Sequence, residues 1–266
     1  MSAPGSLLEG RIALVTGGGR GIGAGIATML AGAGAAVAIN FRSDADSAQA
    51  LVKSIRADGG TAEAFAGSVA SYDECAALAT AVASSLGPVD LLVNNAGIAS
   101  KGRSVADTEP GELERVLRTH AFGPHHLSSL LLPGMRTVAA QPGRRGDIVM
   151  ISSVATDHDS GWGAPYNMGK AAIESLARTM AKEEVSNNIH VNIVAPGLVV
   201  SEMGRRLAKA TAGVSDIHEL DATYPFGHVC TPEDVARVVL FFVSDAAGYV
   251  TGQRVAVNGG GPMIRR

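Results

Sequence analysis

The chain of 266 residues contains only two cysteines, Cys75 and Cys230. They lie far apart, show no Cys-x-x-Cys spacing and have no clustered histidines around them. A disulfide framework or a zinc site needs several such ligands at short, regular spacing. We therefore predict no metal site. Because unpaired cysteines are typical of a reducing compartment, we also predict a cytoplasmic location.

Charged residues are few as well, at 18% of the chain, and they leave a net charge of −3. No long basic run is present, so the sequence gives no electrostatic support for binding to nucleic acid or to an anionic membrane. The most apolar helical stretch, Val235–Val243, is too short to span a bilayer. The expected partner is a small-molecule substrate, with neither nucleic acid nor a membrane.

Short apolar runs alternate with longer segments of helical periodicity along the chain, which is 46% hydrophobic and contains 33 glycines. Several runs are continuously apolar, as is typical of strands buried on both faces of a parallel sheet. The sequence predicts a single α/β domain over residues 1–266, a Rossmann-type doubly wound parallel sheet of about seven strands with helices on both faces. The expected strands are 12–16, 35–41, 61–66, 91–94, 147–152, 190–195 and 254–257. The expected helices are 21–33, 45–57, 72–86, 112–132, 164–185 and 232–244.

A glycine-rich turn, Thr16–Gly23, follows the first expected strand and opens the first expected helix. Glycines let the backbone turn tightly and approach a pyrophosphate, whose charge is stabilised by the helix N-terminus. The same residues could serve only a tight turn and close helix–strand packing. In an alternating strand–helix chain, the position of the turn favours dinucleotide binding. The spacing is Gly-x-x-x-Gly-x-Gly, which differs from the Gly-x-Gly-x-x-Gly of other dinucleotide folds.

Tyr166 and Lys170 lie four residues apart on an expected helix, so both side chains face the same side. A phenol with an ordinary pKa of about 10 is a poor acid near neutral pH. A neighbouring ammonium favours the phenolate and brings the proton within catalytic range. Ser153, thirteen residues before the tyrosine, could hydrogen-bond the oxygen that gains or loses this proton.

Five motifs in order resemble the short-chain dehydrogenase/reductase family, over roughly Leu8 to Pro262. They are Thr16–Gly23, Asn94–Gly97, Ser153 with Tyr166 and Lys170, Pro196-Gly197 and Asn258–Gly260. Within the family, the chain is most similar to the 3-oxoacyl-acyl-carrier-protein reductase and glucose-dehydrogenase-like members. The resemblance implies reversible reduction of a carbonyl to a secondary alcohol by a nicotinamide cofactor. It also implies assembly as a homotetramer, with a dimer as the other option.

The resemblance assigns roles to individual positions of this chain. Ser153 would orient the substrate carbonyl, Tyr166 would deliver its proton, and Lys170 would bind the nicotinamide ribose and keep the tyrosine acidic. Asn94–Gly97 and Pro196-Gly197 could also be ordinary turns at strand ends. The implied cofactor-binding residues are Gly17, Gly19, Arg20, Gly21, Ile22, Gly23, Asn40, Arg42, Ser68, Val69, Asn94, Ala96, Gly97, Tyr166, Lys170, Pro196, Gly197 and Val199.

The end of the second expected strand bears on which cofactor is used. Enzymes that use NAD carry an acid there for the ribose hydroxyls, whereas this chain has Asn40-Phe-Arg-Ser43. Asp44 and Asp46 are interpreted as first-turn residues of the next helix, beside a Ser43 cap. Arg42 and Arg20 stand where the family places cations for a 2′-phosphate, although both could be solvated surface groups. We predict that NADP(H) is preferred, with NAD(H) as the second option.

Three positions depart from the family pattern. His120 replaces a catalytic asparagine, where an imidazole could relay protons or could be a helix residue without a catalytic part. Ser68 replaces an acid that contacts the adenine, and His228 replaces an arginine before the last helix. The first two departures leave open a degenerate member that binds nucleotide as a non-catalytic regulator or scaffold.

The segments expected to determine substrate specificity contain few recognisable sequence motifs. Residues 199–228 are expected to form a lid of short helices, and Thr156–Pro165 to line the opposite wall. Trp162 within that wall could stack on a ligand or merely cover the cleft.

Overall fold

The computed structural model describes residues 7–261, so both ends of the predicted domain, including Pro262, lie outside the described residues. One sheet of seven parallel strands runs through this part of the chain, in the order β3-β2-β1-β4-β5-β6-β7. The order reverses between β1 and β4, which makes the sheet doubly wound as predicted. The strands are β1 Ile12–Val15, β2 Ala36–Phe41, β3 Thr61–Ala66, β4 Leu91–Asn94, β5 Gly146–Ile151, β6 Ile189–Pro196 and β7 Arg254–Val257.

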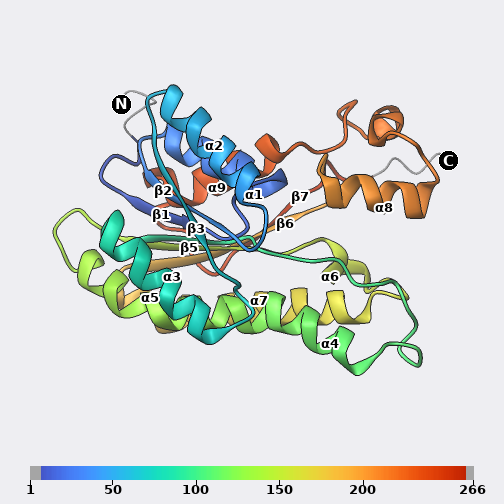
Figure 1. Cartoon of the computed structure of the whole chain (residues 1–266), viewed down its shortest axis with the longest axis horizontal. Coiled ribbons are helices and arrows are strands. Elements are labelled where there is room, and N and C mark those ends of the chain that lie inside the picture. The colour runs from blue at the N-terminus through green and yellow to red at the C-terminus, as the bar shows by residue number, and fades with distance from the viewer. Residues whose placement is uncertain (1–6, 262–266) are drawn as a thin grey trace.

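Helices cover both faces of the sheet (Figure 1). On one face lie α1 Gly21–Gly32, α2 Ala45–Ala57 and α9 Pro232–Val243, and on the other lie α3 Tyr72–Ser85, α5 Gly123–Ala139 and α7 Ala164–Glu183. Alternate residues of β1 serve the two cores, because successive side chains of a strand point to opposite faces. Ala13 and Val15 pack with α1, α2 and α9, whereas Leu14 packs with α3, α5 and α7. Within residues 7–261, no helix combines the length and apolarity that crossing a membrane requires.

The expected helix over 112–132 is confirmed, but its middle turn is π-helical. The structure has α4 at Pro110–Leu117, a π-helical segment at Arg118–Phe122, and then α5. Pro124 has no N–H, so it cannot donate the α-helical bond to the carbonyl of His120. The N–H of Gly123 instead bonds the carbonyl of Arg118, five residues back. His120 lies within this π-helical turn, and only 1% of its surface is exposed.

The expected cap of α2 is displaced by one residue. The side chain of Asp44, rather than that of Ser43, accepts a hydrogen bond from the Ser47 N–H at 3.1 Å. Asp44 therefore stabilises the helix start and is not an acid left free for a ribose. The other predicted helices and all seven predicted strands are confirmed to within a few residues at their ends.

Two short segments extend beyond the carboxyl ends of the strands, on the right-hand side of Figure 1. One is α6 at Ala155–His158, which leads into α7. The other contains α8 at Glu202–Ala212 and a 3-10 helix at Ile217–Thr223, which share a small apolar cluster of Ala208, Ile217, Tyr224 and Val229. Further 3-10 turns occupy Val185–Asn187 and Asp245–Ala247.

The amino ends of the central strands meet at a buried ion cluster. Arg11 pairs with Asp90 and with Asp147, each at 2.8 Å, and both carboxylates are nearly inaccessible to solvent. Arg144 and Arg145 supply further cations to the same two carboxylates. Ion pairs thus stabilise the side of the sheet where the strands begin. The lid segment and the glycine turn lie on the opposite side, at the carboxyl ends of the strands.

Candidate active site

Tyr166, Lys170 and Ser153 come together at the carboxyl edge of the sheet. Tyr166 and Lys170 share one face of α7, with the ammonium 5.7 Å from the centroid of the phenol ring. Lys170 is only 4% exposed, and its Nζ donates to the carbonyl of Ile151, the last residue of β5, at 2.7 Å. Ser153 follows β5 two residues later and accepts a hydrogen bond from the Ala155 N–H at 3.2 Å.

Burial dominates the protonation of this pair. It raises the pKa of Tyr166 because a low-dielectric site disfavours the phenolate, and a hydrogen bond with Ser153 offsets part of this effect. The expectation that Lys170 lowers the tyrosine pKa is therefore not met in the structure. Burial also lowers the pKa of Lys170, to about 8, against an opposing attraction from Glu174. Near neutral pH the site holds a neutral phenol beside an ammonium.

His120 reaches this site from the π-helical segment. Its Nε2 lies 2.8 Å from the carbonyl oxygen of Ile98, while its buried Nδ1 has no partner among the described residues. Burial and the charge of Lys170 lower the pKa of the imidazole to about 3, so the ring is neutral at ordinary pH. Space for the ring comes from two glycines. A Cβ on Gly97 would lie 2.9 Å from its Cε1, and one on Gly169 would lie 2.8 Å from its Cβ.

The glycine turn is held against the end of β4. The Thr16 hydroxyl accepts hydrogen bonds from the N–H groups of Asn95 and Ala96, at 3.0 and 2.9 Å. The Asn95 side chain donates to the carbonyls of Thr16 and Gly17 in return. Gly23 is required by this packing, because a Cβ there would lie 2.3 Å from the Gly17 oxygen.

Three features of this edge fit a dinucleotide. The backbone between β1 and α1 carries no side chain over Gly17–Gly19, so a pyrophosphate can approach it closely. The first N–H groups of α1 receive no side-chain cap from Arg20, and uncapped helix N-termini bind anions. Asn94 ends β4 with a buried Nδ2 that has no partner among the described residues.

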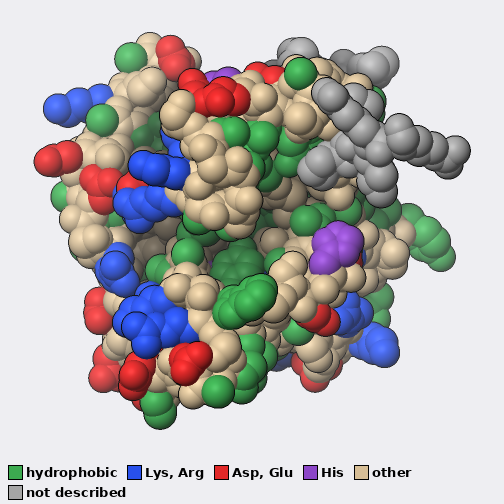
Figure 2. All heavy atoms as spheres, turned by 90° about the vertical axis from the view of Figure 1, so that its right-hand side faces the viewer, with side chains coloured by type: hydrophobic (Ala, Val, Ile, Leu, Met, Phe, Trp, Pro, Cys, Tyr) green, Lys and Arg blue, Asp and Glu red, His purple; other side chains and the backbone are tan. Residues whose placement is uncertain are grey.

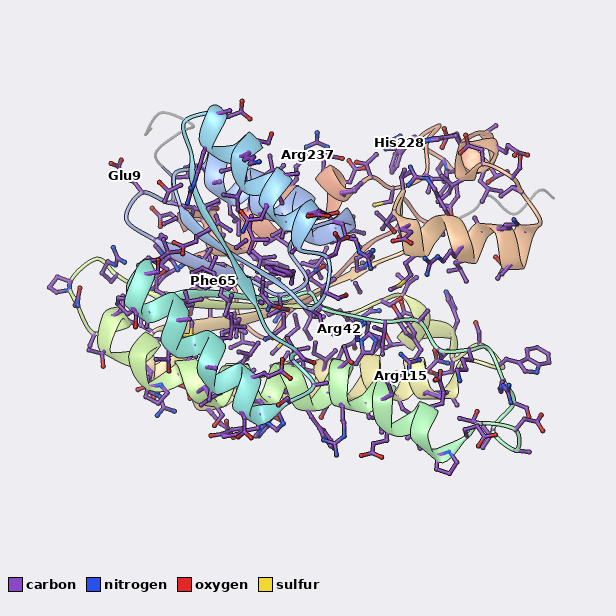
Figure 3. The ribbon with its side chains drawn as sticks, viewed as in Figure 1. Glu9, Arg42, Phe65, Arg115, His228 and Arg237 are labelled. Carbon is purple, nitrogen blue, oxygen red and sulfur yellow. The ribbon has the colours of Figure 1, made fainter. Side chains whose placement is uncertain are left out.

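The residues predicted to choose the cofactor differ in their contacts. Asn40 is buried, and its side chain bonds the backbone of Gly17 and Gly67, which ties β2 to the glycine turn. Arg20 pairs with Glu202 at 2.8 Å and lies 3.7 Å from Asp44. Arg42 is exposed and forms no ion pair within residues 7–261. In Figure 3 it lies beside the end of β2, between the two helix layers.

The remaining predicted cofactor residues surround the same edge. Ile22 packs against the core beside the glycine turn. Ser68 and Val69 follow β3, and the Val69 backbone is so close to Gly123 that a Cβ there would lie 2.6 Å from its oxygen. Pro196 bonds the Val154 N–H, which brings the end of β6 beside Ser153. Val199, the first residue of the lid segment, is buried and forms a parallel bridge with Cys230, two residues beyond the end of that segment.

Sequence reasoning missed two groups of residues. Thr16 and Asn95 hold the glycine turn, and their signal lies within the motifs themselves. Glu174, one turn beyond Lys170 on α7, binds Ser152, Thr156 and Arg254. The four-residue spacing from Lys170 was the available signal for this carboxylate.

The face that carries this edge is hollowed at its centre (Figure 2). Hydrophobic side chains lie on the floor of the hollow, and Lys and Arg side chains gather along one side of it. The large hydrophobic residues that remain exposed include Met203 and Leu207 of α8 and Trp162 of the opposite segment. A doubly wound parallel sheet with a glycine-rich turn between its first strand and first helix is typical of the Rossmann-fold class of dinucleotide-binding proteins.

Comparisons with known proteins place the chain within that class. The family model described as enoyl-(acyl carrier protein) reductase matches residues 17–261. The chain is 34% identical to acetoacetyl-CoA reductase of Shinella zoogloeoides over 250 residues, covering 94% of this chain and 98% of that protein. It is 36% identical to 3-oxoacyl-acyl-carrier-protein reductase of Staphylococcus epidermidis over 249 residues, covering 93% and 97%. The chain belongs to the short-chain dehydrogenase/reductase family.

Solved structures agree with this assignment. A 7α-hydroxysteroid dehydrogenase complexed with NADH and 7-oxo glycochenodeoxycholic acid superposes with a TM-score of 0.87 at 34% identity, covering 98% of each chain. A putative NAD(P)-dependent gluconate 5-dehydrogenase from Beutenbergia cavernae, with bound NADP at low occupancy, has a TM-score of 0.85 at 34% identity. It covers 97% of this chain and 98% of that one. Both similarities extend over the whole fold and not only over the glycine turn.

Proposed function

We propose that this oxidoreductase uses NADP(H) to reduce a ketone, such as a 3-oxoacyl group, reversibly to a secondary alcohol, with Tyr166 as general acid and base. The observation that carries the proposal is the convergence of Tyr166 and Lys170 of α7 with Ser153 at the carboxyl edge. That edge is where ligands bind in open α/β sheets. The uncapped start of α1 and the bare glycine turn lie at the same edge.

Tyr166 is in the right form to act as an acid. Reduction consumes one hydride and one proton, and the proton has to reach the carbonyl oxygen as its negative charge develops. The raised pKa of Tyr166 keeps the phenol protonated, and Ser153 supports the same oxygen through its hydroxyl. Bound NADPH would supply the hydride to the carbonyl carbon. In the reverse reaction the phenolate would take the proton of the alcohol.

Lys170 supports this chemistry through position and charge. One of its three N–H donors is used by the Ile151 carbonyl, which leaves the others to bind the nicotinamide ribose. Its positive charge stabilises the phenolate formed after proton transfer. Because its pKa is about 8, reduction should slow as pH rises through that value and the ammonium is lost.

The cofactor preference rests on charge at the end of β2. Asn40 has no negative charge to repel a 2′-phosphate, and Asp44 is engaged as the cap of α2. Arg42 is exposed beside this position, with no ion pair within residues 7–261 to compete for it. These contacts support NADP(H) over NAD(H). Of the two related structures, the 7α-hydroxysteroid dehydrogenase contains NADH and the gluconate 5-dehydrogenase contains NADP.

Substrate selection is assigned to the segment at 199–228 as a lid. It carries a small apolar cluster of its own and extends beyond the carboxyl edge of the sheet (Figure 1). Exposed Met203 and Leu207 on α8 offer an apolar surface. This surface supports an acyl or other apolar ketone as the substrate. So do the acetoacetyl-CoA and 3-oxoacyl groups for which two of the relatives are named.

Assembly as a homotetramer and a cytoplasmic location stay predictions. The run Val238–Val243 supplies Val239, Phe242 and Val243 to the core, while Phe241 remains 43% exposed. Such a residue on the last helix is available for a subunit contact. Sedimentation velocity would measure the assembly directly.

A substrate-panel assay tests the proposal. The panel would contain 3-oxoacyl thioesters, free 3-oxo acids and cyclic ketones, each measured with NADPH and with NADH. Turnover of one class with NADPH supports a ketoreductase. Cofactor binding without turnover across the panel would instead support the non-catalytic member of the family that the sequence left open.

A further inference from the structure

Glu174 is a buried carboxylate at the back of the candidate active site. It lies one helical turn beyond Lys170 on α7 and is 6% exposed. One of its oxygens, Oε1, accepts from the Ser152 hydroxyl at 2.7 Å and from the Thr156 hydroxyl at 2.9 Å. The same oxygen lies 2.8 Å from Nε of Arg254. A carboxylate this buried with three donors is held in one place.

Arg254 extends the network to the backbone of Ser153. It comes from β7, at the far edge of the sheet, and its NH2 group donates to the Ser153 carbonyl at 3.3 Å and to the Thr156 hydroxyl at 3.0 Å. It also pairs with Asp157 of α6 at 2.9 Å. Glu174 and Arg254 together therefore join α6, α7 and β7 to the segment after β5, which carries Ser153.

We propose that the Glu174–Arg254 ion pair positions Ser153 and balances the charge of Lys170 during carbonyl reduction. This inference rests on the proposed function, and neither residue touches the reacting atoms. Arg254 fixes the Ser153 carbonyl, and Glu174 fixes both Arg254 and the neighbouring Ser152. The Ser153 hydroxyl is thereby held beside the phenol of Tyr166.

The charge effect follows from the spacing along α7. Glu174 opposes the burial that lowers the pKa of Lys170, so removing its charge would make the ammonium weaker still. The titratable groups around Lys170 are Tyr166 and Glu174 on its own helix and His120 on the π-helical segment. The charged groups around Glu174 are Arg178 on α7 and Arg254 on β7, which is paired in turn with Asp157 on α6.

Two substitutions separate charge from position. Glu174→Gln keeps a side-chain oxygen that can accept hydrogen bonds but removes the negative charge. We expect kcat to fall by roughly ten- to a hundredfold, because a displaced serine loses alignment. The alkaline limb of the pH–rate profile should also move to lower pH, by roughly one unit. Arg254→Lys keeps the positive charge but loses the forked donors. It should lower kcat while leaving the alkaline limb near its wild-type position.

Glu184→Gln is the matched control. Glu184 is also a buried carboxylate in an ion pair, with Arg136, but it stands at the far end of α7. It should lose stability in thermal unfolding while keeping the kcat and the pH profile of the wild type. If Glu184→Gln reproduced the kinetic changes of Glu174→Gln, those changes would reflect general destabilisation, and the proposal would be overturned.

The same experiment distinguishes the two levels of inference. Tyr166→Phe, measured alongside, tests the proposed function. If it kept full activity, that function would fail and the positioning role with it. If Tyr166→Phe were inactive while Glu174→Gln kept wild-type kcat and alkaline limb, only the positioning role would be wrong. Should Glu174→Gln fail to fold, kcat and the pH profile of Arg254→Lys decide the question.

Discussion

The imidazole of His120 contacts the ring of Tyr166 edge to face, with the two ring centroids 5.3 Å apart. This contact places a neutral histidine where the family pattern has an asparagine. Its Nε2 bonds the backbone of Ile98, a contact that an amide could also make. The imidazole thus holds the loop after β4 through Ile98, and its buried Nδ1 has no partner among the described residues.

We predict that His120 makes the protein sensitive to acid. Its pKa is about 3 in the folded protein and about 6.5 in the unfolded chain. Between these values the unfolded chain binds more protons, so stability present above pH 6.5 is lost as pH falls toward 3. The loss from this residue should reach roughly 3 kcal/mol by pH 4. Urea unfolding of the wild type and of His120→Asn at pH 7 and pH 4 measures it.

The informative quantity is the change in the stability difference between the two proteins. His120→Asn should lose less stability than the wild type on acidification, whatever its stability at pH 7. An equal loss in both proteins would show that the imidazole is not held neutral. Retained turnover in His120→Asn would support the view that the imidazole stands in for an amide.

Tyr166→Phe should abolish turnover without weakening cofactor binding. A positioned general acid contributes roughly a hundred- to ten-thousandfold to the rate, so kcat should fall at least about a hundredfold. Cofactor affinity, measured by fluorescence titration, should stay near the wild-type value because the ring itself remains. Tyr249→Phe is the control, since Tyr249 is fully exposed. Wild-type kcat in Tyr166→Phe would remove the tyrosine from the chemistry.

Arg42→Ala should reduce the preference for NADPH over NADH. Loss of a cation beside the 2′-phosphate should raise KM for NADPH by roughly tenfold, the size of one charge-assisted contact. KM for NADH should change little. Arg237→Ala serves for comparison, because Arg237 is an exposed arginine that pairs with Asp234 on α9. An unchanged ratio of kcat/KM for the two cofactors would contradict the assignment of Arg42.

Arg11→Met should destabilise the protein through the amino edge of the sheet. The change leaves Asp90 and Asp147 buried with less compensating charge. Breaking a buried pair from one side costs about 3–5 kcal/mol, although Arg144 and Arg145 will offset part of it. Arg118→Met breaks an exposed pair with Glu114 and should cost less than about 1 kcal/mol. Equal losses in the two variants, measured by urea unfolding, would show that the buried cluster adds no stability.

The sheet was predictable because its strands are marked by short-range features of the sequence. Strands buried on both faces appear as continuous apolar runs, such as Leu91–Val93, and turns mark their ends. The pair Tyr166 and Lys170 was predictable for the same reason, since residues four apart share a helix face. The π-helical turn at Arg118–Phe122 was missed because the apolar spacing continues through it. The local signal for this turn is Pro124, which has no N–H to donate to the carbonyl of His120.

The surroundings of the site depend on contacts that no local pattern records. Glu174 meets Ser152, Thr156 and Arg254, which arrive from three other segments. The pKa of Tyr166 was misjudged in the same way. A neighbouring ammonium is visible in the sequence, but the burial that outweighs it exists only after folding.

Gly169 and His120 constrain each other. A Cβ at position 169 would lie 2.8 Å from the Cβ of His120 and 3.3 Å from its Cγ. Every residue except glycine carries a Cβ, so a smaller side chain at position 120 would leave this contact in place. Alanine at position 169 therefore requires α7 and the π-helical segment to move apart, and the close approach of these two helical segments depends on a glycine at that position.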